Sequence, residues 1–529
     1  MNENITLKID NREISVPKGT TILEAARELG IDIPTLCYMN LKDLCIKNAP
    51  ASCRICVVEV DGRKNLAPSC ATRCENGMNV HTNTMRVLNA RRTVLELMLS
   101  DHPSDCLVCA KSGSCELQAV AIKLGIREIP FQGTQTEYKV DLSPSIRRDA
   151  TKCIYCRRCE MMCNDIQTVG ALGAVNRGFD SVVMPAFDQA LQDSECTFCG
   201  QCVAVCPVGA LTELDHTNRL IKDLANPDKT VIVQTAPAVR AALGEEFGLP
   251  AGTSVTGKMV AALRKLGFAK VFDTDFAADL TIMEEGTELL GRLTAFLNGD
   301  KDVKLPIITS CCPGWVNFFE KQFPDLLDNP SSARSPQQMF GAIAKTYWAE
   351  KMGIKREDLI VVSVMPCLAK KFESERDEFR TNGDPDVNYS ISTRELAALI
   401  KQTNINFMQL ENEDFDAPLG ESTGAAVIFG ASGGVMEAAL RTVYRVLEGK
   451  EAPADFYQLR PVRGLNNRKE AEVTIAGKNL RVCILYGTAA AEEFLAGDMS
   501  GYHFVEVMTC PGGCISGAGQ PDCGSVPVS

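Results

Sequence analysis

The sequence predicts a multidomain α/β protein, and three observations support this prediction. The chain has 529 residues, which is too long for a single hydrophobic core. Of its 24 cysteines, 17 precede residue 207, and none lies between Cys206 and Cys311. From about residue 230 onward, short β-branched runs alternate with helical stretches, as is typical of parallel sheets covered by helices. We therefore expect small cysteine-rich modules at the front of the chain and one large α/β domain at the back.

The bulk composition excludes several classes of protein. The net charge of −12 and the pI of about 5.1 argue against a nucleic-acid partner, which would need a basic surface. The first residues lack an apolar signal segment, and no run of about 18 apolar residues suggests a membrane span. We expect a cytoplasmic protein with no membrane partner. Because disulfide frameworks belong to oxidising compartments and small chains, metal ligation is the better interpretation of the cysteines.

Residues 1–82 are expected to form the first module. ITLKID and REISV predict a hairpin, TTILEAARELG predicts a helix capped by Thr20 or Thr21, and CVVEVDG predicts a further strand. This β-grasp pattern resembles a 2Fe–2S ferredoxin. Cys45 and Cys74 lie near the predicted ligands and remain alternatives to them. The predicted ligands of the 2Fe–2S cluster are Cys37, Cys53, Cys56 and Cys70.

Residues 83–140 are expected to form a second module. The segment MRVLNARRTVLELML predicts an amphipathic helix over residues 85–99. One histidine and three cysteines follow it, and they suit either one 4Fe–4S cluster or a Cys3His zinc site. The ferredoxin-like motifs downstream favour the cluster. The predicted ligands are His102, Cys106, Cys109 and Cys115.

Residues 141–222 contain the strongest signal in the chain. CIYCRRCEMMC and CTFCGQCVAVCP both have the spacing C-x2-C-x2-C-x3-C, and Pro207 follows the second run. This is the bacterial ferredoxin pattern, in which the fourth cysteine of each run ligates the other cluster. Zinc sites or free thiols are the alternatives. The motifs predict two 4Fe–4S clusters, held by Cys153, Cys156, Cys159, Cys163, Cys196, Cys199, Cys202 and Cys206.

Residues 223–529 are expected to form a large α/β domain. Its predicted strands are VIVQTAP, AKVFDTD, LPIITS, DLIVVSVMP, AAVIFGASGG, RVCILYG and YHFVEVMTC, and VTGKMVAALRKLG and MEAALRTVYRVLEG are predicted helices. Residues 295–305 read as a loop. Functional residues in such folds follow the carboxyl ends of strands, where this sequence places cysteines in three loops. Because adjacent cysteines do not easily serve one cubane, Cys311 and Cys312 are expected to have different roles.

Three segments of this domain, TSCCPGW, MPCLAKKFE and EVMTCPGGC, closely resemble the signature motifs of FeFe (iron-only) hydrogenases. With the cysteine modules, the resemblance extends over the whole chain and fits the long, multi-cluster form of the family. It implies an H-cluster, in which a 4Fe–4S cubane is joined through one cysteine to a di-iron unit with carbon monoxide, cyanide and a dithiolate amine. The implied cubane ligands are Cys312, Cys367, Cys510 and Cys514, of which Cys514 is the shared one.

The resemblance also implies roles for residues around the H-cluster. Cys311 would pass protons to a path through Glu285, Ser331, Glu288 and Arg292. On helical spacing alone, the face with Glu285, Glu288 and Arg292 would instead be a solvated charged one. Lys370 would bind cyanide, and Met365, Met508, Ala236 and Pro237 would line the pocket. Ala518 departs from the family's glycine run, Cys483 is expected in the core, and Cys523 has no predicted role.

The implied activity is reversible dihydrogen oxidation and proton reduction, with electrons relayed through iron–sulfur clusters. The 2Fe–2S module favours an NAD-linked, electron-bifurcating complex with flavin-bearing, NADH-oxidising iron–sulfur subunits, and ferredoxin is the other expected electron partner. No G-x-G-x-x-G motif follows a predicted strand, so nicotinamide would bind elsewhere. Maturation proteins would assemble the H-cluster. The alternatives are a stand-alone ferredoxin hydrogenase, a hydrogen sensor, or a non-catalytic iron–sulfur electron carrier.

Overall fold

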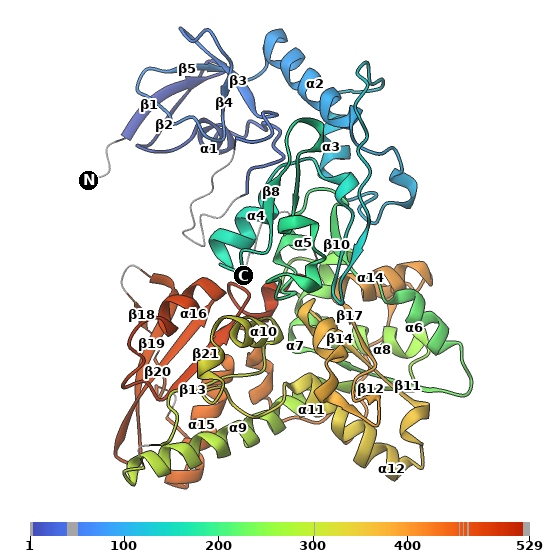
Figure 1. Ribbon diagram of the computed structural model, residues 1–529, viewed down its shortest axis with the longest axis vertical. Coiled ribbons are helices and arrows are strands. Elements are labelled where there is room, and N and C mark those ends of the chain that lie inside the picture. The colour runs from blue at the N-terminus through green and yellow to red at the C-terminus, as the bar shows by residue number, and fades with distance from the viewer. Residues whose placement is uncertain are drawn as a thin grey trace.

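The computed structural model describes residues 4–39, 51–300, 302–453, 455–458, 460–462 and 465–521. The N-terminal modules lie above a larger C-terminal part, which consists of two lobes side by side (Figure 1). Cys45 and Cys523 lie outside the described residues, so their roles stay open.

The first module is a five-stranded sheet with one helix, and it contains the predicted hairpin, helix and further strand. The hairpin of β1 and β2 turns through Asp10 and Asn11, which both have positive φ. Thr21 caps helix α1 through a reciprocal capping box with Glu24, which settles the choice between Thr20 and Thr21. The sheet order is β2-β1-β5-β3-β4. The elements are β1 (Asn4–Ile9), β2 (Arg12–Pro17), α1 (Ile22–Glu28), β3 (Val57–Val60), β4 (Ala67–Pro68) and β5 (Asn79–His81).

The middle of the chain connects this sheet to the C-terminal part. The helix predicted over residues 85–99 is α2, and its buried Arg91 donates to the Val57 carbonyl at 2.8 Å, which attaches it to the first module. Short elements then surround the ferredoxin-like motifs. They are α2 (Met85–Ser100), α3 (Glu116–Lys123), β6 (Asp141–Leu142), β7 (Ile146–Arg148), α4 (Arg158–Met161), β8 (Gly173–Val175), β9 (Val182–Met184), α5 (Gln201–Val205), β10 (Leu211–Glu213) and α6 (Thr217–Leu224).

One lobe of the C-terminal part is built on a parallel sheet of order β12-β11-β14-β17, as the strand–helix alternation predicted. Its strands are buried almost throughout, as expected of a sheet covered on both faces. The elements are β11 (Thr230–Thr235), α7 (Pro237–Ala242), α8 (Thr256–Leu266), β12 (Lys270–Asp273), α11 (Pro336–Ile343), α12 (Ala349–Met352), β14 (Leu359–Met365), α13 (Ala369–Glu375), β15 (Arg380–Thr381), β16 (Asp384–Pro385), β17 (Tyr389–Ser392) and α14 (Thr393–Gln402).

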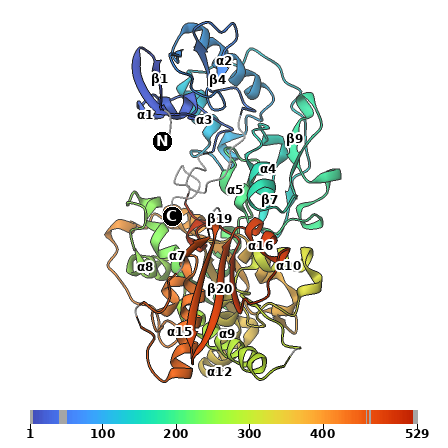
Figure 2. The same ribbon diagram turned by 90° about the vertical axis from the view of Figure 1, so that its left-hand side faces the viewer.

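The other lobe is built on a mixed sheet of order β13-β21-β20-β19-β18. Strands β13, β21 and β20 are parallel, whereas β19 and β18 extend the sheet in antiparallel fashion. Helices α9 and α15 lie against the lower part of this sheet (Figure 2). The elements are α9 (Thr274–Leu297), β13 (Ile307–Ile308), α10 (Pro313–Gln322), α15 (Gly434–Glu448), β18 (Arg460–Val462), β19 (Leu465–Ile475), β20 (Lys478–Tyr486), α16 (Thr488–Leu495) and β21 (Phe504–Met508).

Two sequence predictions are wrong in this lobe. The segment AAVIFGASGG is no strand, because Ala425–Gly430 forms a 3-10 helix between Gly424 and Gly433, both of which have positive φ. The loop expected over residues 295–305 starts later, because α9 continues to Leu297. Cys483 lies in β20 and is fully buried, as predicted.

Candidate active site

The four predicted ligands of the first module lie together. The Sγ atoms of Cys56 and Cys70 are 3.3 Å apart, and hydrogen bonds from Cys53 and Cys70 hold the pKa of Cys37 far below its usual value. Cys74 is buried nearby, and burial raises its pKa to about 11, with Glu24 and Glu28 adding to the rise. Among the cysteines that the structure describes, none perturbs the pKa of Cys74, which favours the predicted four thiols over Cys74.

The second predicted ligand set lies at the end of α2 and just before α3. The Nδ1 atom of His102 is buried without a hydrogen-bond partner among the described residues. Burial lowers its pKa, which favours the neutral imidazole that binds metals. Gly209 packs closely against this set, because a Cβ there would lie 2.5 Å from the Cys109 sulfur. Cys106 and Cys109 both add to the raised pKa of Cys115, so the three thiols face one another.

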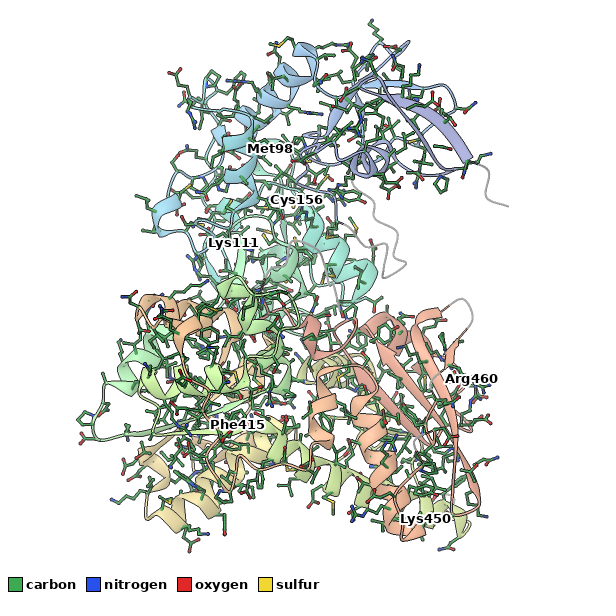
Figure 3. The ribbon with its side chains drawn as sticks, turned by 180° about the vertical axis from the view of Figure 1, so that it is seen from behind. Met98, Lys111, Cys156, Phe415, Lys450 and Arg460 are labelled. Atoms are coloured by element: carbon green, nitrogen blue, oxygen red, sulfur yellow. The ribbon has the colours of Figure 1, made fainter. Side chains whose placement is uncertain are left out.

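The two ferredoxin-like motifs line two enclosed cavities, and each motif gives its fourth cysteine to the other cavity. This crossing is the arrangement that the spacing predicted, and it gathers four thiols around each cavity. Cys156, which lines the first of these cavities, lies between the N-terminal modules and the two lobes (Figure 3). The first cavity is lined by Cys153, Cys156, Cys159 and Cys206. The second is lined by Cys163, Cys196, Cys199 and Cys202.

The first module contacts the ferredoxin-like module beside its predicted 2Fe–2S ligands. Met39, two residues after Cys37, packs against Met161 and Met162 in one buried cluster. The Cys37 thiolate also contributes to the raised pKa of Arg158, which lies between two predicted cubane ligands. The predicted 2Fe–2S ligands therefore lie near the first of the two cysteine-lined cavities.

The predicted cysteine ligands of the C-terminal domain follow the carboxyl ends of three strands, as expected. Cys312 comes after β13 and is the N-cap of α10, Cys367 comes after β14, and Cys510 comes after β21. Cys312 and Cys514 both raise the pKa of Cys367, and all three of these thiols add to the raised pKa of Cys510. The four predicted cubane ligands thus face one another although they come from distant loops.

This donor set fits a cubane. Thiolates are the soft ligands that iron–sulfur clusters use, and the four thiols lie near one another, with Cys510 buried and the other three partly buried. In the part of the chain that the structure describes, no three His, Cys, Asp or Glu side chains are close enough to hold a single metal ion.

Cys311 lies beside a buried carboxyl group. Burial raises the pKa of the Cys311 thiol well above its usual value, and Glu285 adds to the rise. Glu285 is on α9 and has no exposed surface. Burial raises the pKa of Glu285 to about 8. The Glu288 and Glu506 carboxyls also raise this pKa, whereas a hydrogen bond from the Ser331 hydroxyl lowers it. Both groups therefore hold protons at neutral pH.

The remaining residues of the predicted proton path form a hydrogen-bonded chain that leads outward along α9. The Ser331 hydroxyl donates to Glu288 at 3.1 Å, and Arg292 donates to the other Glu288 oxygen at 2.6 Å. The Glu288 and Arg292 side chains are about one-fifth exposed. The face of α9 is thus buried at Glu285 and reaches solvent two turns later, so a uniformly solvated face is excluded.

Lys370 is buried at the start of α13 with its ammonium group directed at the site. It donates to the Cys311 carbonyl at 3.2 Å and to Glu373 at 2.9 Å. Burial lowers its pKa, but Glu373, Cys367 and Cys311 outweigh this effect, and the pKa is raised overall. Lys370 therefore provides a fixed buried cation next to the cysteine loops.

The predicted pocket-lining residues lie at the ends of β14, β21 and β11. Met365 and Met508 end β14 and β21, and both are buried. Ala236 caps α7, and Pro237 is its first residue. Ala518, the departure from the glycine run, is accommodated because Gly200 lacks a side chain: a Cβ on Gly200 would lie 2.9 Å from the Ala518 Cβ.

Glu506 was missed by the sequence reasoning. It lies in the middle of β21 with no exposed surface, and its two oxygens accept from the amides of Gly433 and Met436 at 2.6 and 2.7 Å. It thereby fixes the N-terminus of α15 beside the site. Its burial raises its pKa to about 7. A lone acidic residue inside the apolar run YHFVEVM was the available signal.

Comparison with known proteins decides the family. The model of the iron only hydrogenase large subunit, C-terminal domain, matches residues 229–518. The chain belongs to the iron-only (FeFe) hydrogenase family. It is an oxidoreductase that acts on dihydrogen, and it is the catalytic subunit.

Relatives and solved structures agree with this. The chain is 63% identical over 521 residues to the NADP-reducing hydrogenase subunit HndD of Solidesulfovibrio fructosivorans, covering 98% of this chain and 88% of that protein. It is 40% identical over the same length to iron hydrogenase 1 of Clostridium pasteurianum, with the same coverage. A solved structure of the FeFe-hydrogenase HydA1 from Chlamydomonas reinhardtii covers 58% of this chain and 85% of its own, at 40% identity and a TM-score of 0.53.

Three further family models match the front of this hydrogenase. A 2Fe-2S iron-sulfur cluster binding domain matches residues 2–85, and the NADH-ubiquinone oxidoreductase-G iron-sulfur binding region matches residues 91–130. The NADH-quinone oxidoreductase subunit 3, ferredoxin-like domain, matches residues 143–212. The predicted fold class, with 2Fe–2S and 4Fe–4S modules before an H-cluster domain, is confirmed. Among the described helices, none has the length and apolarity needed to span a bilayer.

Proposed function

We propose that this hydrogenase subunit works in a complex that exchanges electrons between dihydrogen and a nicotinamide cofactor, in an electron-bifurcating manner. The observation that carries the proposal is the 63% identity, over 98% of the chain, with a subunit of an NADP-reducing hydrogenase. Flavin-bearing iron–sulfur subunits would bind the nicotinamide, and ferredoxin would be the second electron partner. A stand-alone ferredoxin-dependent enzyme is the second candidate, because iron hydrogenase 1 is 40% identical over the same length.

The proposed modules are residues 1–82, 83–140, 141–222 and 223–529. They would hold one 2Fe–2S cluster, three 4Fe–4S clusters and the H-cluster, through the cysteines and the histidine described above. The two cavities that are each lined by four cysteines support the two central cubanes. When bound, the di-iron unit of the H-cluster supplies the metal site at which dihydrogen is formed or split.

The protein's own residues would move the proton. Cys311 keeps its proton on Sγ at neutral pH because burial raises its pKa, so it can donate toward the pocket and be reprotonated from behind. Glu285, with a pKa near 8, is protonated at neutral pH and suits that role. From there the path continues through Ser331 and Glu288 to Arg292 near the surface. Lys370 would hold a cyanide ligand, and Met365, Met508, Ala236 and Pro237 would exclude water.

The proton path is tested with Cys311→Ser, because a serine hydroxyl is a far weaker acid than a thiol. We expect at least about a hundredfold loss of dihydrogen evolution from a reduced dye, since general acid–base groups contribute about that much or more. Iron content and the infrared bands of bound carbon monoxide and cyanide should be retained. Cys483→Ser is the matched control, because it removes another buried thiol away from the path. Full activity in Cys311→Ser contradicts the relay role.

The complex is tested by anaerobic purification of the tagged native subunit. Flavin-containing subunits that oxidise NADH or NADPH should co-elute in fixed ratio, and dihydrogen should then reduce the nicotinamide only in the complex. Elution of this chain alone, with full activity toward ferredoxin, supports the stand-alone enzyme instead.

A further inference from the structure

A glutamine of the ferredoxin-like module reaches into the catalytic domain. Gln201 is the first residue of α5 and lies between the predicted cluster ligands Cys199 and Cys202. Its side chain is buried, and its Nε2 atom lies 3.1 Å from the Sγ atom of Cys510 and 3.2 Å from the Ser516 carbonyl oxygen. It therefore joins the ligand loop of one proposed cluster to a ligand sulfur of the next.

The chemistry of the two partners fixes the orientation of this amide. A metal-bound Cys510 thiolate and the Ser516 carbonyl are both acceptors, so the NH2 end of Gln201 must face them. Its two N–H groups are then both used, one on the sulfur and one on the carbonyl. The carbonyl contact holds the amide in place, so the sulfur receives its hydrogen bond without further ordering of the side chain.

The surrounding packing shows that the two domains meet closely at this point. A Cβ on Gly314 would lie 3.1 Å from the Thr509 hydroxyl and 3.5 Å from the Cys199 Cβ, so only a glycine separates the two ligand loops there. The Cys199 thiolate also contributes to the raised pKa of Cys510. The second cubane cavity and the four catalytic cysteines are therefore neighbours.

We propose that Gln201 is a positioning residue that raises the reduction potential of the H-cluster cubane through its hydrogen bond to the Cys510 sulfur. This inference rests on the proposed cubane ligands. Reduction adds one electron, supplied by the neighbouring cluster of Cys163, Cys196, Cys199 and Cys202, which is oxidised by one electron. The added negative charge is partly carried by the sulfurs. A donor to a ligand sulfur therefore stabilises the reduced state more than the oxidised state.

The test measures the cubane's midpoint potential by electron paramagnetic resonance and infrared titration of the holoenzyme. Gln201→Leu and Gln201→Met remove the donor, and Gln201→Glu replaces it with a negative charge. A hydrogen bond to a charged acceptor is worth about tenfold or more in an equilibrium constant, and only the difference in its strength between the two redox states moves the potential. The oxidised-to-reduced ratio at fixed potential should therefore rise by up to about tenfold in the donor-less variants, which equals a downward shift of up to about 59 mV for a one-electron couple. Gln201→Glu should shift the midpoint potential of the cubane further downward.

Gln167→Leu is the matched control. Gln167 is equally buried, comes from the same module and donates to the Thr509 carbonyl at 3.1 Å, so it makes an interdomain hydrogen bond that reaches no sulfur. The cubane potential should stay unchanged in this variant. A wild-type potential in both donor-less variants, or an equal shift in Gln167→Leu, overturns the proposal. Cys510→Ala tests the ligand set separately, because retention of the cubane signal there refutes the ligand assignment and not only the role of Gln201.

Discussion

Replacing Lys371 by methionine should destabilise the catalytic domain by about 3–5 kcal/mol, because it leaves a buried carboxylate without its counter-charge. Lys371 has no exposed surface and donates to both Glu395 oxygens, at 2.9 and 2.7 Å, and to the Ser390 carbonyl. Glu395 would keep its bonds from the amides of Ser392 and His216 but lose Lys371, the only cation bonded to it in the described part of the chain. The hydrogen bond from the His216 amide connects the segment after the ferredoxin-like module to the lobe with the parallel sheet.

The destabilisation caused by Lys371→Met should increase with pH. Burial raises the pKa of Glu395, and Lys371 opposes that rise. Without the lysine, the folded-state pKa lies higher still, so the variant is least destabilised at low pH, where Glu395 is protonated. The destabilisation should grow as pH rises through that pKa.

The assay is urea unfolding of the anaerobic holoprotein, followed by tryptophan fluorescence. The chain has two tryptophans, Trp315 and Trp348, and both are buried in the catalytic part, so the signal reports that domain. Lys401→Met is the matched control: its pair with Glu246 is exposed, with 49% and 24% of the side chains accessible, and should contribute less than about 1 kcal/mol. The double variant Lys371→Met with Glu395→Gln should recover most of the unfolding free energy that Lys371→Met loses. Equal effects of Lys371→Met and Lys401→Met refute the reasoning.

Two further predictions follow from close contacts and burial. In the folded protein Glu285 holds its proton up to about pH 8, whereas in the unfolded chain it loses the proton near the ordinary pKa of a glutamate. Its contribution to the unfolding free energy is therefore complete at low pH and is lost as the pH rises to about 8. Glu285→Gln should remove a slope of up to about 1.4 kcal/mol per pH unit from the unfolding free energy over this window; an unchanged slope argues against the buried neutral carboxyl. Gly209→Ala should lower the iron content by about four atoms, because its Cβ would lie 2.5 Å from the Cys109 sulfur. Gly173→Ala, where a Cβ meets nothing within 4 Å, is the control, and equal iron in both variants contradicts the placement of the His102 site.

Local sequence patterns predicted the parts of the molecule that local chemistry determines. The spacing of the ferredoxin-like cysteines predicted the crossing between two cavities, because short loops around cubanes leave little choice of geometry. The Thr21 cap and the strands that precede the cysteine loops were predicted for similar reasons.

Features that depend on tertiary packing were not predictable in this way. Spacing alone favoured a solvated face on α9, because nothing in the segment says that Glu285 packs under the cysteine loops. The run AAVIF has the composition of a strand, but its flanking glycines with positive φ turn it into a 3-10 helix. Gln201 has no signature of its own, since its sulfur partner is 309 residues away in the sequence. Glu506 is noticeable as an acidic residue in an apolar run, but its partners at the start of α15 are not predictable from that run.

The four catalytic thiols do not belong to one sheet. Cys367 follows β14 in the parallel lobe, whereas Cys312 and Cys510 follow strands of the mixed lobe. Any group that binds all of them is therefore a cross-link between two separately hydrogen-bonded halves. Loss of that group would remove one link between the halves while leaving each half's own backbone bonding intact, so hydrogen exchange should rise first where the two halves meet and last inside the strands.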